Sequence, residues 1–424
     1  MRCLPVHPSP YAGGPIAQAT SLWKTRDYML LWSGQVVSTL GSTASSIVFP
    51  LLILALTHSP AAAGIAGALR AAPYLIFSLP VGALIDRWDR KRVMIVCDVW
   101  RAVAVLTVPL ALWLDALTIW QIYVVTFVEG SLFVFFNIAE VAALPRVVPA
   151  GLLPQAAAQN EAAFGAANIV GPSIGTFLYQ VLGKSAPFVA DALSYLASVV
   201  SLLLIRTEFR LAKAAPSTSL RVDIAEGLRW LWHKPLIRYM AFLTGGLNLV
   251  NAAIPLIVIV LARELGAHDV EIGLIFSIGG IGGIVGSLVG GRIQRRFSFG
   301  QVIIAVLWVE ALLFPLYALA PRYYLLGAIY ALCYTMSPIY NVVQFSYRLA
   351  LIPDALQGRV NSTFRLIAFG FMPLGAAISG FLLEWIGTVP TILFFALWYL
   401  ALAVLTTLNR HVREARPLAA VAAD

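Results

Sequence analysis

Charged side chains are scarce in this sequence. They make up 12% of its 424 residues, whereas 60% of the residues are hydrophobic and the mean hydropathy is +0.85. A soluble domain carries about 25% charged residues and needs polar side chains to cover its surface. Disordered chains are also poor in apolar residues. The composition therefore excludes both classes and predicts a protein that crosses the membrane many times.

Cysteine and histidine are few as well. The three cysteines, Cys3, Cys97 and Cys333, are too scattered for a disulfide framework or a zinc site. All five histidines fall in tails or between apolar runs, which argues against a haem, a histidine-metal cluster or a Ser-His triad in the membrane. We therefore expect no metal, no cofactor and no enzymatic activity. The net charge of +9 fits loops that face anionic lipid, so no nucleic-acid partner is expected.

The apolar runs are nearly continuous and do not alternate as the strands of a membrane β-barrel do. A helix needs about 20 apolar residues to cross the bilayer. The first twenty residues, rich in proline and glycine, are expected to form a disordered tail rather than a signal peptide. The sequence predicts an all-α membrane protein with twelve transmembrane helices, near residues 29–56, 62–85, 93–114, 118–145, 154–182, 185–205, 237–262, 270–291, 299–320, 323–350, 358–384 and 388–408.

Lysine and arginine are distributed unequally between the segments that join these spans. With the N-terminus inside, the inside segments hold most of them, and the outside segments hold only Lys184, Arg263 and Arg322. Cytoplasmic loops are the ones that carry excess positive charge. We therefore expect both termini in the cytoplasm, in a multi-pass protein of the cell inner (cytoplasmic) membrane.

The longest segment between spans divides the chain into two pseudo-symmetric halves of six spans. We expect a cytoplasmic tail at 1–28, a six-helix bundle at 29–205, a cytoplasmic linker at 206–236, a second six-helix bundle at 237–408 and a cytoplasmic tail at 409–424.

Within the linker, Ala225, Leu228 and Trp232 recur at helical spacing opposite Arg221 and Arg229. This pattern predicts an amphipathic helix. The helix either lies in the inner membrane interface or simply tethers the two halves, and the sequence favours neither.

The two halves share an internal pattern. Span 5 contains Asn160 and, twelve residues later, Pro172; span 11 contains Asn361 and, twelve residues later, Pro373. Internal repeats in a polytopic protein predict a transporter whose site lies near mid-membrane, where the halves meet.

The segment between spans 2 and 3 runs from Gly82 to Arg92 and combines a glycine, an Asp-Arg pair and a basic cluster. Gly82 is expected to let two helices approach closely, and Asp86 to cap or charge-pair a helix N-terminus. The segment resembles the loop signature of the major facilitator superfamily. That resemblance implies a gating latch in which Asp86 meets the start of span 11 near Gly358. An ordinary positive-inside loop would explain only the cations that hold the loop at the inner surface: Arg87, Arg90, Lys91 and Arg92.

Span 5 carries Gly165, Gly171, Pro172 and Gly175. Glycines on one helix face permit close packing, and a proline favours a kink. The group is similar to the Gly-Pro-x-x-Gly antiporter motif of facilitator-type drug exporters, with Thr176 where a second glycine is common. Simple helix packing is the alternative explanation.

Further phrases, at residues 31–35, 191–195 and 358–362, resemble the branch of macrolide-efflux proteins and enterobactin exporters. The resemblance runs across all twelve spans and implies a drug:proton antiporter-like transporter. The chain departs from many drug:proton antiporters at residues 127–130, where Phe-Val-Glu-Gly stands in place of their span 4 Arg-x-x-x-Gly pattern.

Ionisable side chains inside a span are costly unless they are paired or face water, so they are functional candidates. Arg70 lies 16 residues before Asp86, and Glu129 lies 17 before Arg146, which places both about 24 to 26 Å from the cytoplasmic ends of their spans. Equal depth and opposite charge predict an Arg70–Glu129 pair facing a central cavity. A carboxylate binds a proton more readily when its cation moves away, which makes Glu129 the first candidate for proton coupling. A permanently closed structural pair is the alternative.

The other charges within the spans fall into three groups. Asp98 and Arg101 lie one turn apart near the inner end of span 3 and are expected to join the latch. Glu161, a second candidate for proton coupling, and Arg365 lie about 10 Å inside the cytoplasmic face. They either bridge the halves, guide the substrate or serve local structure. Two charges on the peripheral spans 6 and 9 are expected to stabilise helix contacts: Asp191 and Glu310.

Polar and aromatic residues at helical spacing outline a substrate cavity suited to a bulky amphipathic molecule. The candidates are Gln35, Ser38, Ser42, Phe133, Asn137, Asn248, Asn251, Tyr334, Asn341, Gln344 and Arg365.

These features predict a monomeric secondary transporter that exports a hydrophobic or amphipathic small molecule, such as a drug, a siderophore or another secondary metabolite. Its expected partners are the small-molecule substrate, protons and membrane lipid, and its mechanism is alternating access. No Gly-x-x-x-x-Gly-Lys-Ser/Thr loop is present, so ATP hydrolysis is not expected. The alternatives are an importer or lysolipid flippase on the same fold, a membrane-embedded enzyme and a receptor without flux.

Overall fold

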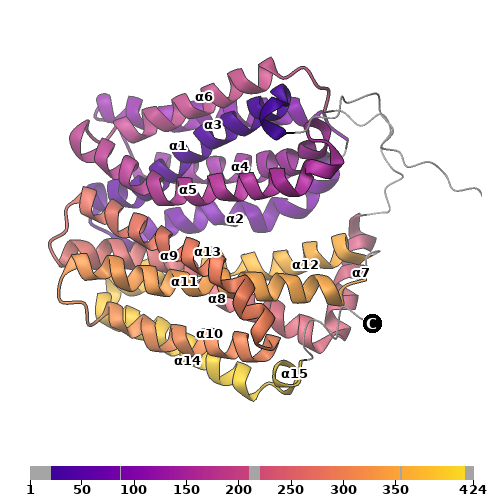
Figure 1. Ribbon diagram of the computed structural model, residues 1–424. Coiled ribbons are helices and arrows are strands. Elements are labelled where there is room, and N and C mark those ends of the chain that lie inside the picture. Colours follow the sequence, from indigo (N-terminus) through magenta and orange to yellow (C-terminus); the bar gives the residue numbers. More distant parts are fainter. Residues whose placement is uncertain (1–20, 86, 210–219, 354–355, 416–424) are drawn as a thin grey trace, which may run out of the picture.

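The computed structural model describes residues 21–85, 87–209, 220–353 and 356–415, and every regular element within them is helical (Figure 1). The elements are η1 (Leu22–Lys24), α1 (Arg26–Thr57), α2 (Pro60–Ile85), α3 (Arg90–Trp113), α4 (Ile119–Val147), η2 (Ala150–Leu152), α5 (Leu153–Val181), α6 (Ala186–Leu204), α7 (Leu220–His233), α8 (Pro235–Glu264), α9 (Asp269–Arg296), α10 (Phe299–Leu313), η3 (Phe314–Tyr317), α11 (Tyr323–Leu351), α12 (Gln357–Gly370), α13 (Met372–Trp385), α14 (Thr388–Leu408) and α15 (Arg410–Arg413).

The helices form two bundles. Helices α1 to α6 pack on one another in the first half, and α8 to α14 do so in the second half. Figure 1 shows the two halves one above the other, with α7 at one end of the second half, where it packs against α12. Because lipid offers no partner for backbone N–H and C=O groups, apolar runs of this length fold as helices that satisfy their own hydrogen bonds.

Among the described residues, eleven helical segments are long and apolar enough to cross a membrane. Helix α5, with 29 residues, matches them in length but is more polar, since its first turns carry Gln155, Gln159, Asn160 and Glu161. With α5, which matches the eleven in length only, the described part of the chain contains twelve helical segments that are long enough to cross a membrane.

The eleventh span is not the continuous helix expected over 358–384. It is broken at Phe371 into α12 and α13, with Pro373 in the first turn of α13. Proline has no N–H to donate to the preceding turn, so it is tolerated at the start of a helix and interrupts one elsewhere.

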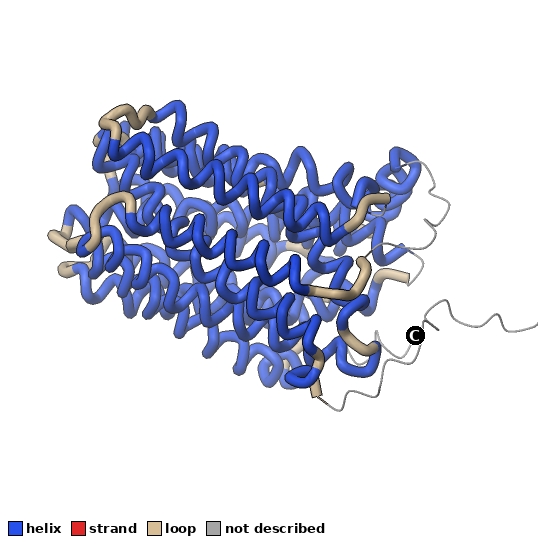
Figure 2. The backbone as a smooth tube through the Cα atoms, turned by 90° about the horizontal axis from the view of Figure 1, so that it is seen from above, coloured by secondary structure: helices blue, strands red, loops and turns tan. Residues whose placement is uncertain are grey.

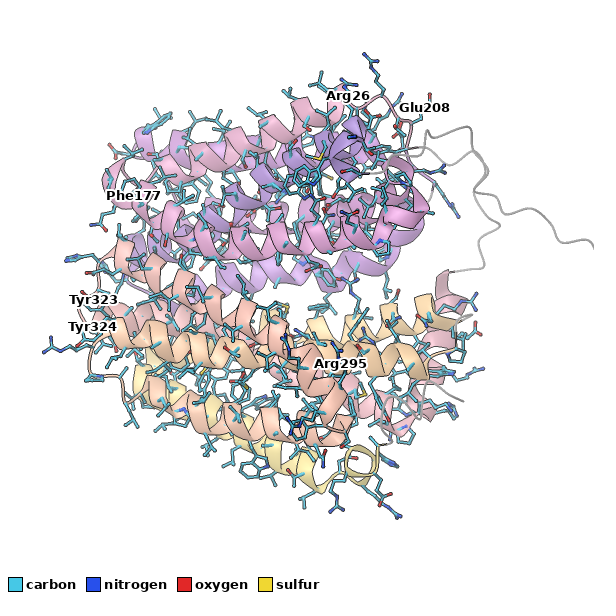
Figure 3. All side chains as sticks on the ribbon, in the orientation of Figure 1. Arg26, Phe177, Glu208, Arg295, Tyr323 and Tyr324 are labelled. Carbon is cyan, nitrogen blue, oxygen red and sulfur yellow. The ribbon has the colours of Figure 1, made fainter. Side chains whose placement is uncertain are left out.

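The loops gather at two ends of the molecule, as the view from above shows (Figure 2). The linker end carries α7 and the neighbourhood of Arg26 and Glu208; the far end carries Tyr323 and Tyr324 (Figure 3). Several helices begin with side-chain caps. At the linker end, for example, Asp89 accepts the backbone N–H groups of Lys91 and Arg92 at the start of α3.

The halves touch from the far end to about the middle of the bundle. At the far end, Gly64 of α2 lies directly against Gly380 of α13. Ser173 of α5 and Ser277 of α9 share a hydrogen bond of 2.7 Å. Toward the linker end, by contrast, side chains of α5 and α9 are exposed, among them Phe164 of α5.

Candidate functional site

A buried carboxylate lies inside the first half. Glu129 of α4 is 1% exposed, and its Oε1 atom accepts a hydrogen bond from Arg70 Nη2 of α2 at 3.0 Å. Tyr195 of α6 donates its hydroxyl to the same oxygen at 3.2 Å, and Arg101 Nη2 of α3 lies 3.9 Å away. Four helices therefore converge on one oxygen. We call Ser42, Arg70, Asp98, Arg101, Glu129 and Tyr195 the Glu129 cluster.

Arg101 is the central cation of this cluster. It is 3% exposed, and its Nη1 lies 3.4 Å from Asp98 Oδ1. Its Nη2 reaches Ser42 Oγ of α1 at 3.4 Å, and the guanidinium lies 4.1 Å from the centre of the Tyr195 ring. The two carboxylates of Asp98 and Glu129 thus share one fully buried arginine, which is the arrangement that a low-dielectric interior requires.

The expectation that Asp98 and Arg101 belong to the latch is corrected by this geometry. Arg101 contacts Glu129, Ser42 and Tyr195 in the middle of the half, and Asp98 is paired with Arg101 there. Arg101 lies eleven residues into α3, which is about 16 Å from the loop at its start. The rise of the helix carries both side chains away from the latch segment.

Close packing of α2 on α4 sets Arg70 opposite Glu129. Gly130 follows Glu129 directly, and a Cβ atom there would collide with the backbone carbonyl of Arg70. Glycine therefore lets the two helices approach to backbone contact. The structure brings the predicted partners Arg70 and Glu129 together; their role in proton coupling stays a prediction.

The cluster is not fully satisfied. Within the described residues, Glu129 Oε2, Asp98 Oδ2 and Arg101 Nε are buried and have no hydrogen-bond partner. Arg70 differs from the other charged members because 31% of its side chain is exposed, against 4% or less for the rest. Its guanidinium is the charge of the cluster with the freest access to the space outside the half.

Asp191 borders this cluster, one helical turn before Tyr195 on α6, whereas Glu310 and Glu161 lie apart from it. Asp191 is buried between α6 and α1, where Ser45 donates to its Oδ2 atom at 2.5 Å, in the helix-stabilising place expected for it. Glu310 of α10 is 6% exposed and its Oε2 has no partner among the described residues. Glu161 is exposed on α5, and no ion pair of the described part of the chain includes it.

The latch segment is bound to its own half. Arg90 Nη1 donates to the Ala142 carbonyl of α4 at 2.8 Å, and Lys91 Nζ donates to the Ile205 carbonyl after α6 at 2.6 Å. Arg92 is largely exposed and lies 3.6 Å from the carboxylate of Asp89, which caps α3.

Two further residues of the predicted latch, Gly82 and Arg87, lie within the described part of the chain. A Cβ atom at Gly82 would meet nothing within 4 Å, so the expected close approach of helices at this glycine is wrong in this structure. Arg87 is exposed in the loop. Asp86, the proposed latch carboxylate, lies outside the described residues. The latch therefore stays a prediction.

The glycines of the span 5 motif separate into two kinds. Gly171 lies against Thr43 and Gly175 against the carbonyl of Ala44, so both permit α5 to pack on α1. Gly165 has open space where its Cβ would be, so the expectation of close packing is wrong for it.

The remainder of the motif borders the other half. Pro172 is buried within α5. Thr176, which stands where a second glycine is common, fills the position beside Gly273 of α9. The motif thus joins α5 to α1 on one side and to the second half on the other.

The cavity candidates are divided by burial. Ser38 and Gln344 are 3% and 4% exposed, so their assignment to a cavity wall is wrong in this structure: their helix faces turn into the halves. Ser42 belongs to the Glu129 cluster, and Asn248 donates to the Ala368 carbonyl of α12 at 2.9 Å. The remaining candidates are exposed or half-buried: Phe133, Tyr334, Asn341, Arg365, Gln35, Asn137 and Asn251.

Sequence reasoning missed three residues of interest. Tyr195 follows Asp191 by one helical turn, a spacing that places both on one face of α6. Tyr74 follows Arg70 by the same spacing and carries the contact to the second half, since its ring lies 5.1 Å from that of Phe369. Arg348 of α11 is buried against aromatic rings, and Phe345, three residues earlier in the sequence, was the available signal.

Two helical bundles that meet across a central plane, with paired charges buried inside one of them, define a transporter of the major facilitator fold. The crystal structure of the nucleoside transporter NupG shares this fold: it matches with a TM-score of 0.75 over 93% of this chain and 100% of its own, at 15% identity. The expected fold class is confirmed.

The family model described as transmembrane secretion effector matches residues 19–424, and the chain belongs to this family of the major facilitator superfamily. It is 27% identical to the multidrug efflux pump Tap of Mycolicibacterium fortuitum over 391 residues, which cover 88% of this chain and 93% of that protein. It is 24% identical to macrolide efflux protein A of Streptococcus pyogenes over 405 residues, covering 92% and 98%.

These findings confirm the resemblance to the drug-efflux branch. The family and the relatives are membrane transporters, so the protein is a multi-pass transporter of the cell membrane and not an enzyme.

Proposed function

We propose that this protein exports a hydrophobic or amphipathic small molecule by proton-coupled antiport, with Glu129 as the proton-binding group. One observation carries the proposal: a 1% exposed carboxylate is held by a partly exposed arginine from the helix that contacts the other half. A buried carboxylate in a membrane protein is typical of proton relays. The efflux activity named for the two relatives supports the direction of transport.

The coupling step is a change of partner at Glu129. Because Gly130 packs on the backbone of Arg70, α2 and α4 move together, and Arg70 leaves Glu129 only by rotation of its side chain. Arg101 is 3% exposed and stays in place. With Arg70 away, Glu129 loses its closest cation and gains a proton; with Arg70 back, it releases the proton.

Alternating access connects this step to the substrate. Tyr74, one helical turn from Arg70 on α2, contacts Phe369 of α12 in the other half. When the second half rocks, different residues of that half face α2. The Arg70 guanidinium is then best solvated or paired in a different position. The hydrogen bond between Ser173 and Ser277 and the contact between Gly64 and Gly380 have to open when the far end does.

We place the linker end in the cytoplasm, together with both termini, the 206–236 linker and the two six-helix bundles as delimited from the sequence. The excess of lysine and arginine in the segments at that end supports this orientation. Leu228 and Trp232 of α7 are exposed, while Leu231 is fully buried, which fits a helix with one face toward lipid and one toward the protein.

The test is efflux of a panel of fluorescent dyes and antibiotics from a bacterial strain without its own pumps. The proposal expects efflux that depends on this protein, collapses with a protonophore and is lost in Glu129→Gln. Glu310→Gln is the matched control, because Glu310 is also a buried carboxylate but lies on α10 of the other half, away from the Glu129 cluster. Uptake instead of efflux, or full protonophore-sensitive efflux by Glu129→Gln, would overturn the proposal.

A further inference from the structure

Arg348 of α11 is a buried cation without a counter-charge. It is 5% exposed, and its Nε atom is buried with no hydrogen-bond partner in the described part of the chain. No carboxylate of the described residues lies within ion-pair distance of it. An arginine at the end of a span usually extends its head group into water. Most of the Arg348 side chain is instead packed inside the protein.

The other buried arginines of the described residues have ionic or hydrogen-bond partners in the fold, although Arg101 Nε itself has none. Arg101 has Asp98 and Glu129, and Arg90 donates to the Ala142 carbonyl. Arg359 pairs with Glu226 although both are partly exposed. The fold therefore supplies partners for arginines elsewhere and leaves Arg348 without one.

Aromatic rings are what surround Arg348. Its guanidinium lies 4.0 Å from the centre of the Phe364 ring of α12 and 5.3 Å from that of Phe345. Cation–π contacts of this kind offset only part of the cost of taking a guanidinium out of water. An anion with acceptor atoms would offset the rest.

A second arginine lies next to this position in the chain. Arg365 directly follows Phe364, the residue whose ring lies against the Arg348 guanidinium. Arg365 is exposed, and its guanidinium lies 5.7 Å from the Tyr74 ring of the first half and 5.8 Å from the Phe369 ring. It too has no carboxylate partner in the residues that the structure describes. Two arginines that have no carboxylate partner among the described residues are thus connected through Phe364.

We propose that Arg348 and Arg365 bind an anionic group of the exported molecule, so that the substrate is an aromatic amphiphile bearing a carboxylate, sulfonate or phosphate. The inference rests on the proposed export function and names its substrate class. Guanidinium groups bind such oxyanions through paired N–H donors. The exposed ring of Phe345 and the half-buried ring of Phe369 supply the stacking surface for the aromatic part.

The experiment compares two xanthene dyes of opposite charge, carboxyfluorescein and rhodamine 123, bound to the purified full-length protein and followed by fluorescence polarisation. The wild type should bind carboxyfluorescein more tightly than rhodamine 123. Arg348→Gln should weaken carboxyfluorescein binding about tenfold to a hundredfold, the range expected for loss of charged hydrogen bonds, and leave rhodamine 123 unchanged. Arg348→Lys should retain part of the affinity. Arg359→Gln is the control. Arg359 also lies on α12 but is paired with Glu226, so this variant should bind both dyes as the wild type does.

A stability measurement separates ligand binding from a structural role. Without dye, Arg348→Gln removes an uncompensated buried charge and should melt at or above the wild-type temperature. A lower melting temperature, or unchanged carboxyfluorescein affinity in Arg348→Gln, would overturn the inference. Dye binding is measured without a proton gradient, so a negative binding result does not contradict proton-coupled export. Conversely, a negative efflux result does not affect the interpretation of the binding measurement.

Discussion

The two arginines that contact Glu129 should differ sharply when each is replaced by glutamine. Arg101→Gln leaves Asp98, 0% exposed, and Glu129, 1% exposed, without the cation they share. Removal of one partner from a buried ion pair costs about 3–5 kcal/mol, because the remaining charge is buried and uncompensated. We therefore expect Arg101→Gln to be severely destabilised.

Arg70→Gln should be much milder. The Arg70 side chain is 31% exposed, and Glu129 keeps the Tyr195 hydroxyl at 3.2 Å and Arg101 at 3.9 Å when Arg70 is lost. A partly solvated pair of this kind contributes about 1 kcal/mol or less. The structure thus assigns stability mainly to Arg101 and leaves Arg70 free for a switching role.

The assay is thermal unfolding of both variants in the same detergent, followed by intrinsic fluorescence. A third variant, Arg101→Gln with Asp98→Asn, should recover part of the loss, since it removes the carboxylate that Arg101→Gln leaves without a cation, whereas Glu129 keeps Arg70. Equal melting temperatures for Arg70→Gln and Arg101→Gln would refute the reasoning. So would an Arg101→Gln variant that the second substitution does not improve.

Three further predictions follow from particular contacts. Gly175→Val forces a side chain into the Ala44 carbonyl and should lower the free energy of unfolding by about 1–3 kcal/mol, measured by thermal unfolding. Gly165→Ala adds a methyl group in open space and should be neutral or slightly stabilising. The reverse order of stabilities would contradict the packing. Asp89→Ala removes the cap of α3 and should cost about 1 kcal/mol in the same assay, while Asp89→Asn, which still caps, should cost little; equal losses would show that the cap is unimportant. Oxidation of Ser173→Cys with Ser277→Cys should join the halves at the far end and stop dye efflux until a reductant is added, with either single cysteine as control; efflux that continues after complete cross-linking contradicts alternating access at this contact.

Much of the fold could be predicted because it depends on properties local to each segment. Continuous apolar runs indicate membrane helices wherever they occur, and the basic inter-span segments mark one end of the bundle. The break between α12 and α13 was not predicted, although Pro373 is its physical cause. In α5, Pro172 at the matching repeat position leaves the helix unbroken, so the residue type alone does not decide the outcome.

The part of the candidate site that could be predicted is the part that depends on how deep each charged residue lies in the membrane. Arg70 and Glu129 have equal depth and opposite charge, and the structure places them 3.0 Å apart. The direction in which a side chain points from its helix at that depth depends on how the helices pack, which the sequence does not show. Ser38 and Ser42 are one turn apart on α1, yet Ser38 is buried in its half, while Ser42 bonds to Tyr195. Arg101 was assigned to the latch because nothing in its own span indicates that α3 faces Glu129.

The central claim is that Glu129 carries the coupled proton. The most direct measurement uses proteoliposomes and a dye that the cell assay has shown to be exported, and compares gradient-driven accumulation with exchange of dye across the membrane at equal pH. The account predicts that Glu129→Gln retains exchange but loses accumulation driven by the proton gradient, while Glu310→Gln retains both. A Glu129→Gln protein that still accumulates dye against its gradient when protons flow the other way would contradict it.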